Sequence, residues 1–219
     1  MRHLLIAAII FYLSGSPLHG YSGNDPWHYL EKGIKAFNVE QGFYMLHAFI
    51  PDRNINMDLL AQMAGCETSF FVTATGVTWP AGTSGWSMSR SGEPGYMLFR
   101  VGGSSLDDCR LLWEEIQQAV DCNGTACGFA WSVEAYAGDE SSDLAAAGYQ
   151  LLDRLGATML TGNYYNGTLQ ILGHISWFNE SVDLAEGSVN LDIELFYEPC
   201  RQQVRIRAGV PILITSISY

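Results

Sequence analysis

Polar side chains that could bind a ligand or take part in a reaction alternate with apolar ones along the predicted strands of the second half of the chain. They are Ser132 and Glu134, then Gln170, His174 and Ser176, then Asp192 and Glu194 beside Arg205 and Arg207. Alternate residues of a strand lie on one face of its sheet. If helices cover the opposite face, these side chains form one polar surface. We therefore predict a binding surface made of Glu134, Gln170, His174, Ser176, Arg205 and Arg207.

A hydrolase is the alternative interpretation of the same residues. Ser176 or Ser132 would be the nucleophile, His174 the base and Glu134 the group that orients it. The sequence has no strand-to-helix elbow that would present the serine, and no evident oxyanion hole. His174 and Ser176 are alternate residues of a strand that faces solvent. The sequence thus favours binding without catalysis, and we predict no catalytic residue.

The cysteines and acidic clusters give little support to a metal site or a cofactor. The five cysteines form no C-x-x-C pair, and no histidine lies near one of them in sequence. Cys122 and Cys127 flank an Asn-Gly turn signal and are expected to be neighbours. Asp139, Glu140 and Asp143 lack the alternating oxygen ligands of a calcium loop. We expect neither a metal nor a cofactor.

Residues 1–20 have the pattern of an export signal. Arg2 precedes an apolar run from Leu4 to Leu13, and the small residues Ser14, Gly15 and Ser16 follow it. Ten apolar residues are too few for a free-standing membrane-spanning helix. The segment is expected to be a signal peptide or an uncleaved N-terminal anchor. The protein is then extracytoplasmic, secreted or membrane-anchored, and this segment is its only expected contact with a membrane.

The charge of the chain opposes nucleic-acid binding. Without Arg2 the chain has 10 Lys and Arg residues against 23 Asp and Glu residues. Its only lysines are then Lys32 and Lys35, both in the first predicted helix. A protein this acidic repels phosphate, and a DNA-bending surface needs basic side chains to neutralise the backbone. The expected partners exclude nucleic acid.

The predicted elements suggest an α+β protein with two related halves. A helix from Asp25 to about residue 37 precedes a strand at 42–50, a helix at 54–64 and strands near 68–79, 85–90 and 95–101. The order then repeats with a helix that begins at Ser104 or Ser105, a strand at 128–136 and a helix from Ser141 or Ser142 to Leu155. A strand at 168–177 and a terminal hairpin complete it. We predict two α-β-α-β-β-β repeats, residues 21–103 and 104–219, with an antiparallel sheet covered by helices on one face and one shared core.

The terminal hairpin has the clearest pattern in the chain. Its two runs alternate from Val189 to Leu195 and from Val204 to Val210. With Leu195 opposite Val204, the apolar residues share one face. The same register pairs Glu194 with Arg205 and Asp192 with Arg207 on the other face, and leaves Arg201 without a carboxylate.

This C-terminal stretch resembles the YwmB family of exported proteins from spore-forming Gram-positive bacteria. The resemblance lies in Val189-Asn190-Leu191, the hairpin, and the ending from Gly209-Val210-Pro211-Ile212 to Tyr219. It is specific over residues 187–219 and looser over 42–65. The chain departs from the family by extra residues between Pro211 and Tyr219, and its cysteines match no family pattern.

The resemblance implies a duplicated fold like that of TATA-box-binding protein and an extracytoplasmic location. It supplies no catalytic residue. We expect a non-catalytic binding or accessory protein at the bacterial cell envelope, linked to sporulation or wall assembly, whose partner is an unidentified envelope protein or wall component. The alternative is an envelope hydrolase that uses the Ser/His/Glu cluster.

Overall fold

The computed structural model describes most of the chain and places it in two compact units. The described residues are 26–35, 37, 39–64, 84–90, 95–121, 127–138, 143–178, 181–185 and 187–211. The strand expected near 68–79 lies outside them. The first unit lies between Tyr44 and Phe129, and the second combines Ser22–Phe43 with Ala130–Ile214.

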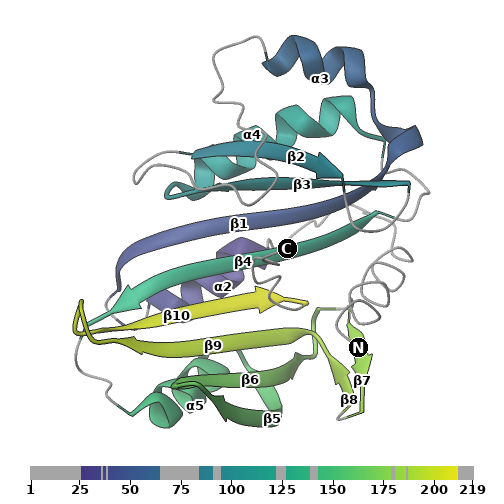
Figure 1. The fold of residues 1–219 in the computed structure, drawn as a ribbon. Coiled ribbons are helices and arrows are strands. Elements are labelled where there is room, and N and C mark those ends of the chain that lie inside the picture. Colours follow the sequence, from purple (N-terminus) through teal and green to yellow (C-terminus); the bar gives the residue numbers. More distant parts are fainter. Residues whose placement is uncertain are drawn as a thin grey trace. The chain divides into compact units, whose positions relative to one another are not determined.

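The first unit is a three-stranded antiparallel sheet with helices. Its strands have the order β2-β3-β1 (Figure 1). Helix α4 packs on β2 and β3, and α3 packs on α4. The elements are β1 (Val39–Pro51, in this unit from Tyr44), the 3-10 turn η1 (Asp52–Asn54), α3 (Met57–Ala64), β2 (Ser84–Arg90), β3 (Tyr96–Gly103) and α4 (Leu106–Ala119).

Helix α4 confirms its predicted start. The Ser105 hydroxyl accepts a hydrogen bond from the backbone N–H of Asp108 at 3.2 Å, which satisfies one of the free donors of the first turn. Cys109 and Ile116, seven residues apart, are both fully buried on one face of the helix.

The second unit is a larger antiparallel sheet of five strands in the order β4-β10-β9-β6-β5. Helix α2 packs on β10 and on α5, and α5 packs on β5, β6 and β9. The elements are α2 (Pro26–Lys35), β4 (Gly128–Ala137, in this unit from Ala130), α5 (Leu144–Arg154), β5 (Ala157–Tyr165), β6 (Thr168–Ile175), β9 (Leu191–Glu198) and β10 (Gln203–Val210), with a separate ladder of β7 (Val182–Leu184) and β8 (Gly187–Val189).

The apolar residues of these strands fall on one face, as the alternation predicts. Val133, Ile193 and Ile206 are buried with their alternate neighbours. Helix α5 lies close against this face at Gly148, because a Cβ atom there would be 2.4 Å from the Cδ1 atom of Ile171. The polar residues lie on the opposite face. The α+β class with a large antiparallel sheet is therefore confirmed.

The compact units do not follow the order of the predicted repeats. Helix α2, from the start of the chain, belongs to the second unit, whereas α4 belongs to the first. Each unit is thus completed by a helix that precedes the other unit's strands in sequence. None of the described helices is long and apolar enough to cross a membrane.

The register of the terminal hairpin differs from the prediction by two residues. Leu195 lies opposite Ile206, and Val204 lies opposite Tyr197. The ladder continues to Glu198 opposite Gln203, which leaves a four-residue turn in which Gln202 has a φ of 53°. The predicted register, continued to the turn, would have left only Pro199 and Cys200 as the loop. Two-residue hairpin turns need a positive φ at their first residue, whereas proline is fixed at about −65°, so a longer turn is required. A shift by two keeps every side chain on its predicted face.

Two further predictions near α5 are corrected. The helix is capped by Asp143, whose Oδ1 accepts hydrogen bonds from the backbone N–H groups of Ala145 and Ala146, and not by Ser141 or Ser142. Aspartate is as good an N-cap as serine, and it lies directly before the first helical residue. Strand β5 was not predicted, and it occupies the stretch between α5 and β6.

Candidate functional site

The polar face of the second unit's sheet is the candidate site. The strand registers place one residue from each strand in a row across it: Glu134, Arg207, Glu194, Gln170 and Asn163. Helices α2 and α5 pack on the other side of the same sheet. The register brings together three of the predicted site residues, Glu134, Gln170 and Arg207.

Arg207 lies between two carboxylates at the centre of this row. Its Nε atom is 3.1 Å from Glu134 Oε2, and its Nη1 atom donates a 2.9 Å hydrogen bond to Glu194 Oε2. The three side chains keep only 21–28% of their surface exposed, so solvent screens the pairs less than it would at a free surface. One guanidinium thus fixes two carboxylates, whereas the predicted register paired Arg207 with Asp192.

Asp192 is instead bonded to Gln170. The Gln170 amide Nε2 donates to both carboxylate oxygens, at 3.0 and 3.2 Å. Asp192 is 5% exposed, so the amide compensates a carboxylate that is almost out of solvent. The planar amide is held in one orientation as a result.

A second group of charges lies nearer the hairpin turn. The Arg205 guanidinium lies over the ring of Phe196 at 5.6 Å and 3.5 Å from a Glu198 carboxylate oxygen. Arg201 lies over the ring of Tyr136 at 4.5 Å and also 3.5 Å from Glu198. Arg201 therefore has a carboxylate partner, contrary to the prediction, and Arg205 pairs with Glu198 and not with Glu194. Both arginines combine an ion pair with a cation–π contact.

Tyr136 connects the two groups. Its hydroxyl donates a 3.3 Å hydrogen bond to Glu134 Oε1, while Arg201 covers its ring. Burial raises the pKa of Tyr136, and the negative charges of Glu134 and Glu198 raise it further. Tyr136 and Phe196 are not among the residues predicted for this surface. The same period of two that selects Glu134 and Glu194 would have found them, because each lies two residues further along its strand.

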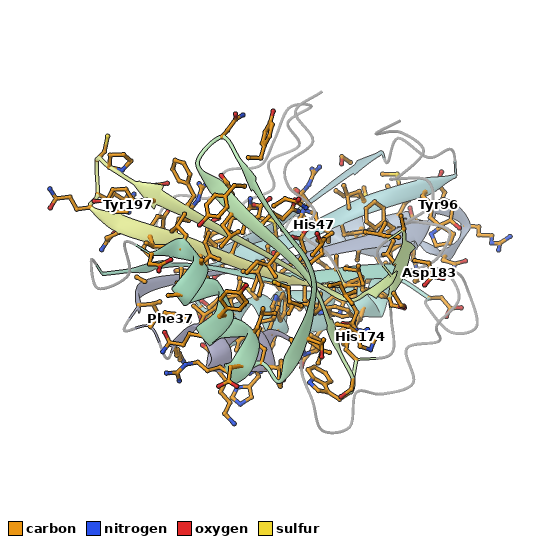
Figure 2. All side chains as sticks on the ribbon, turned by 90° about the horizontal axis from the view of Figure 1, so that it is seen from below. Phe37, His47, Tyr96, His174, Asp183 and Tyr197 are labelled. Carbon is orange, nitrogen blue, oxygen red and sulfur yellow. The ribbon has the colours of Figure 1, made fainter. Side chains whose placement is uncertain are left out.

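The remaining two predicted residues lie elsewhere. His174 Nδ1 is 3.1 Å from the backbone oxygen of Ser188 on β8, and Ser176 lies in the turn after β6. His174 is three strands across from Glu134 and four residues along, which corresponds to about 20 Å. Figure 2 shows His174 and Tyr197 at opposite ends of this sheet. The structure therefore does not bring Ser176, His174 and Glu134 together as a triad.

The described residues contain no group of three His, Cys, Asp or Glu side chains that could hold a metal ion. Cys109 is a buried thiol and Cys200 an exposed one. Burial raises the pKa of Cys109 to about 12, and the charge of Asp108 adds to this rise. The expected Cys122–Cys127 neighbours cannot be compared, since Cys122 lies outside the described residues.

Comparison with protein-family models finds no match to the chain, and no curated protein matches its sequence. The resemblance to the YwmB family therefore stays a prediction that rests on the C-terminal residues themselves.

Proposed function

We propose that the protein is an extracytoplasmic, non-catalytic binding or accessory factor at the bacterial cell envelope, with a role in sporulation or wall assembly. It binds its partner through the polar face. One observation carries the proposal: the charged and amide groups of this face are fixed by one another on the side of the sheet opposite α2 and α5, and the three side chains of the Arg207 group keep 21–28% of their surface exposed. Groups that are already oriented bind a ligand with little loss of conformational entropy.

The state of these groups favours binding over hydrolysis. A general acid or base needs a proton that it can exchange and a reacting group within reach. Glu134 and Glu194 instead bond the same guanidinium, and His174 bonds a backbone oxygen far from them. These side chains are arranged to offer hydrogen bonds.

The charge of the surface points to a partner that is neutral or only weakly charged. Four carboxylates and three guanidinium groups lie on it: Glu134, Asp192, Glu194 and Glu198 with Arg201, Arg205 and Arg207. Such a surface suits a ligand rich in hydroxyl and amide groups, as wall components and envelope proteins are. Nucleic acid is not among the proposed partners, because the chain carries a net charge of −12.

We further propose that the chain has the duplicated fold of the YwmB resemblance, similar to TATA-box-binding protein. The recurring order of elements supports this, since α2-β1-α3-β2-β3 is followed by α4-β4-α5-β5-β6. The second series has in addition β9, β10 and the small β7–β8 ladder. Residues 1–20 are proposed to direct export or to anchor the chain.

A sedimentation assay with purified cell-wall sacculi tests the proposed function. We expect the protein to co-sediment with the sacculi, and Gln170→Ala to weaken its binding by about tenfold, or about 1.4 kcal/mol. Gln150→Ala removes a glutamine from the exposed side of α5 and serves as the matched control, which should bind like the wild type. Thermal unfolding of each variant separates lost binding from lost folding.

Three results would contradict the proposal. One is equal binding by both glutamine variants. A second is stabilisation of the protein by duplex DNA at physiological salt. The third is release of soluble wall fragments that stops in His174→Ala while the melting temperature stays unchanged, which would favour the hydrolase.

A further inference from the structure

Strand β5 forms an outer edge of the second unit's sheet. Within the described part of the chain its ladder partner is β6, on one side only (Figure 1). Its nine residues, ATMLTGNYY, contain no charged residue and no proline. An edge strand presents unpaired backbone N–H and C=O groups, which proteins usually protect with charged residues, proline or short strands. β5 has none of these three, and its protection of another kind is a β-bulge, the register shift between Met159 and Thr161.

Large apolar side chains are concentrated at this edge. Of the six that are exposed among the described residues, Met159, Tyr164 and Tyr165 belong to β5, with 39%, 63% and 71% of their surface exposed. A fourth, Tyr149, is 58% exposed on α5, the helix that packs against β5. Exposed apolar groups gathered beside unpaired backbone groups mark an interaction surface.

We propose that this edge pairs with β5 of a second copy of the chain, antiparallel, to form a two-fold symmetric dimer. Two copies that each carry a charge of −12 repel one another, so their contact is best made where charge is absent, and β5 is an uncharged stretch of nine residues. A second copy also brings an identical unprotected edge, so one contact satisfies the backbone groups of both strands. If the partner were a strand of another protein, the β5 edge of every unbound molecule would still be unpaired and able to self-associate.

The geometry of such a pair has a consequence for the polar face. The two-fold axis of an antiparallel strand pair is perpendicular to the sheet, so both polar faces point to the same side. Five strands from each copy then form one continuous surface. On the proposed function, on which this step rests, a repetitive wall polymer would be bound at two places at once, with the gain in affinity that bivalency gives.

Light scattering after size-exclusion chromatography tests the dimer without any ligand, so its outcome is independent of the wall-binding assay. We expect the mass of two chains at micromolar concentration. The double variant Thr158→Lys and Asn163→Lys should be monomeric, with a dimer dissociation constant raised by about 100-fold or more, since like charges opposed across an interface are strongly unfavourable. Both side chains are exposed on β5, and antiparallel pairing brings the start of one strand opposite the end of the other, so the introduced charges face each other.

The matched control is Gln117→Lys with Gln118→Lys on α4, which adds the same charge at exposed positions of the first unit and should stay dimeric. Hydrogen exchange of the wild type gives a second measurement that needs no variant. The amides of β5 should exchange more slowly as concentration rises. Three results would each overturn the proposal. The first is the mass of a single chain at concentrations up to about 100 μM, and the second is a double lysine variant of β5 that remains dimeric. The third is a wild-type protein that stays monomeric and binds an unrelated extended peptide at the β5 edge.

Discussion

Replacing Arg207 by methionine should lower the free energy of unfolding by about 2 kcal/mol. The guanidinium makes two charge-assisted contacts, at 3.1 Å to Glu134 and 2.9 Å to Glu194. A hydrogen bond to a charged group contributes about 1.5–3 kcal/mol when buried. The side chains here are roughly one-quarter exposed, which reduces each contact to about 1 kcal/mol. Methionine keeps the aliphatic packing, so the loss reports on the charge.

Urea unfolding measures this change directly, and in thermal unfolding it corresponds to a decrease of about 4–8 °C in Tm for a chain of this length. Arg201→Met is the matched control. Its side chain is 53% exposed, its carboxylate contact is 3.5 Å long, and its other contact is the cation–π contact with Tyr136. Together these should be worth no more than about 1 kcal/mol, half of the loss expected at Arg207.

A combined variant tests the charge cluster around Arg207 in a second way. Arg207→Met leaves two carboxylates facing each other without a cation, and Glu134→Gln with Glu194→Gln removes both charges. The triple variant should therefore recover more than half of the lost stability. If Arg207→Met costs no more than Arg201→Met, or if the two glutamines recover nothing, the cluster does not stabilise the sheet as argued.

Three further changes have predicted outcomes. Asn190→Ala should lower the free energy of unfolding in urea by about 3 kcal/mol, because a fully buried amide loses three backbone hydrogen bonds, two with Ile175 at the end of β6 and one with Phe178. Asn163→Ala, at an exposed site, should change it little. Gly103→Ala should cost about 1–3 kcal/mol, since a Cβ atom there would lie 2.6 Å from the Cα atom of Ser84. The raised pKa of Cys109, about 12 in place of 9.0, means that unfolding releases its proton between these pH values. Stability should therefore fall as the pH rises from about 9 to 12, and less steeply in Cys109→Ala.

The alternation of residues was sufficient to predict which face each strand of the terminal hairpin buries. It could not predict the register, because a shift by two residues leaves both faces unchanged. The turn decides the register: Glu198 pairs with Gln203, and the four residues between them close the hairpin. The same charges are therefore on the predicted face with different partners.

Strand β5 was missed for a different reason. Its sequence mixes small, polar and aromatic residues without a period of two, and most of its side chains are exposed. Nothing local distinguishes it from a loop, and its order comes from the ladder with β6. The sequence also could not predict that α2 packs in the second unit and α4 in the first. The apolar face of a helix shows that the helix packs on a sheet, but does not specify which sheet.

The two-residue shift changes what the polar face can bind. In the predicted register Arg205 and Arg207 each neutralised one acid, and both pairs were simple cross-strand contacts. In the observed register Arg207 is shared by Glu134 and Glu194, and Gln170 compensates Asp192. A ligand that needed a free arginine would have to break two contacts at once, so an anionic partner gains little here. A neutral partner can bond the remaining lone pairs of these fixed oxygens with none of the existing contacts broken. The register therefore favours hydroxyl and amide donors, the ligand class on which the wall-binding assay depends.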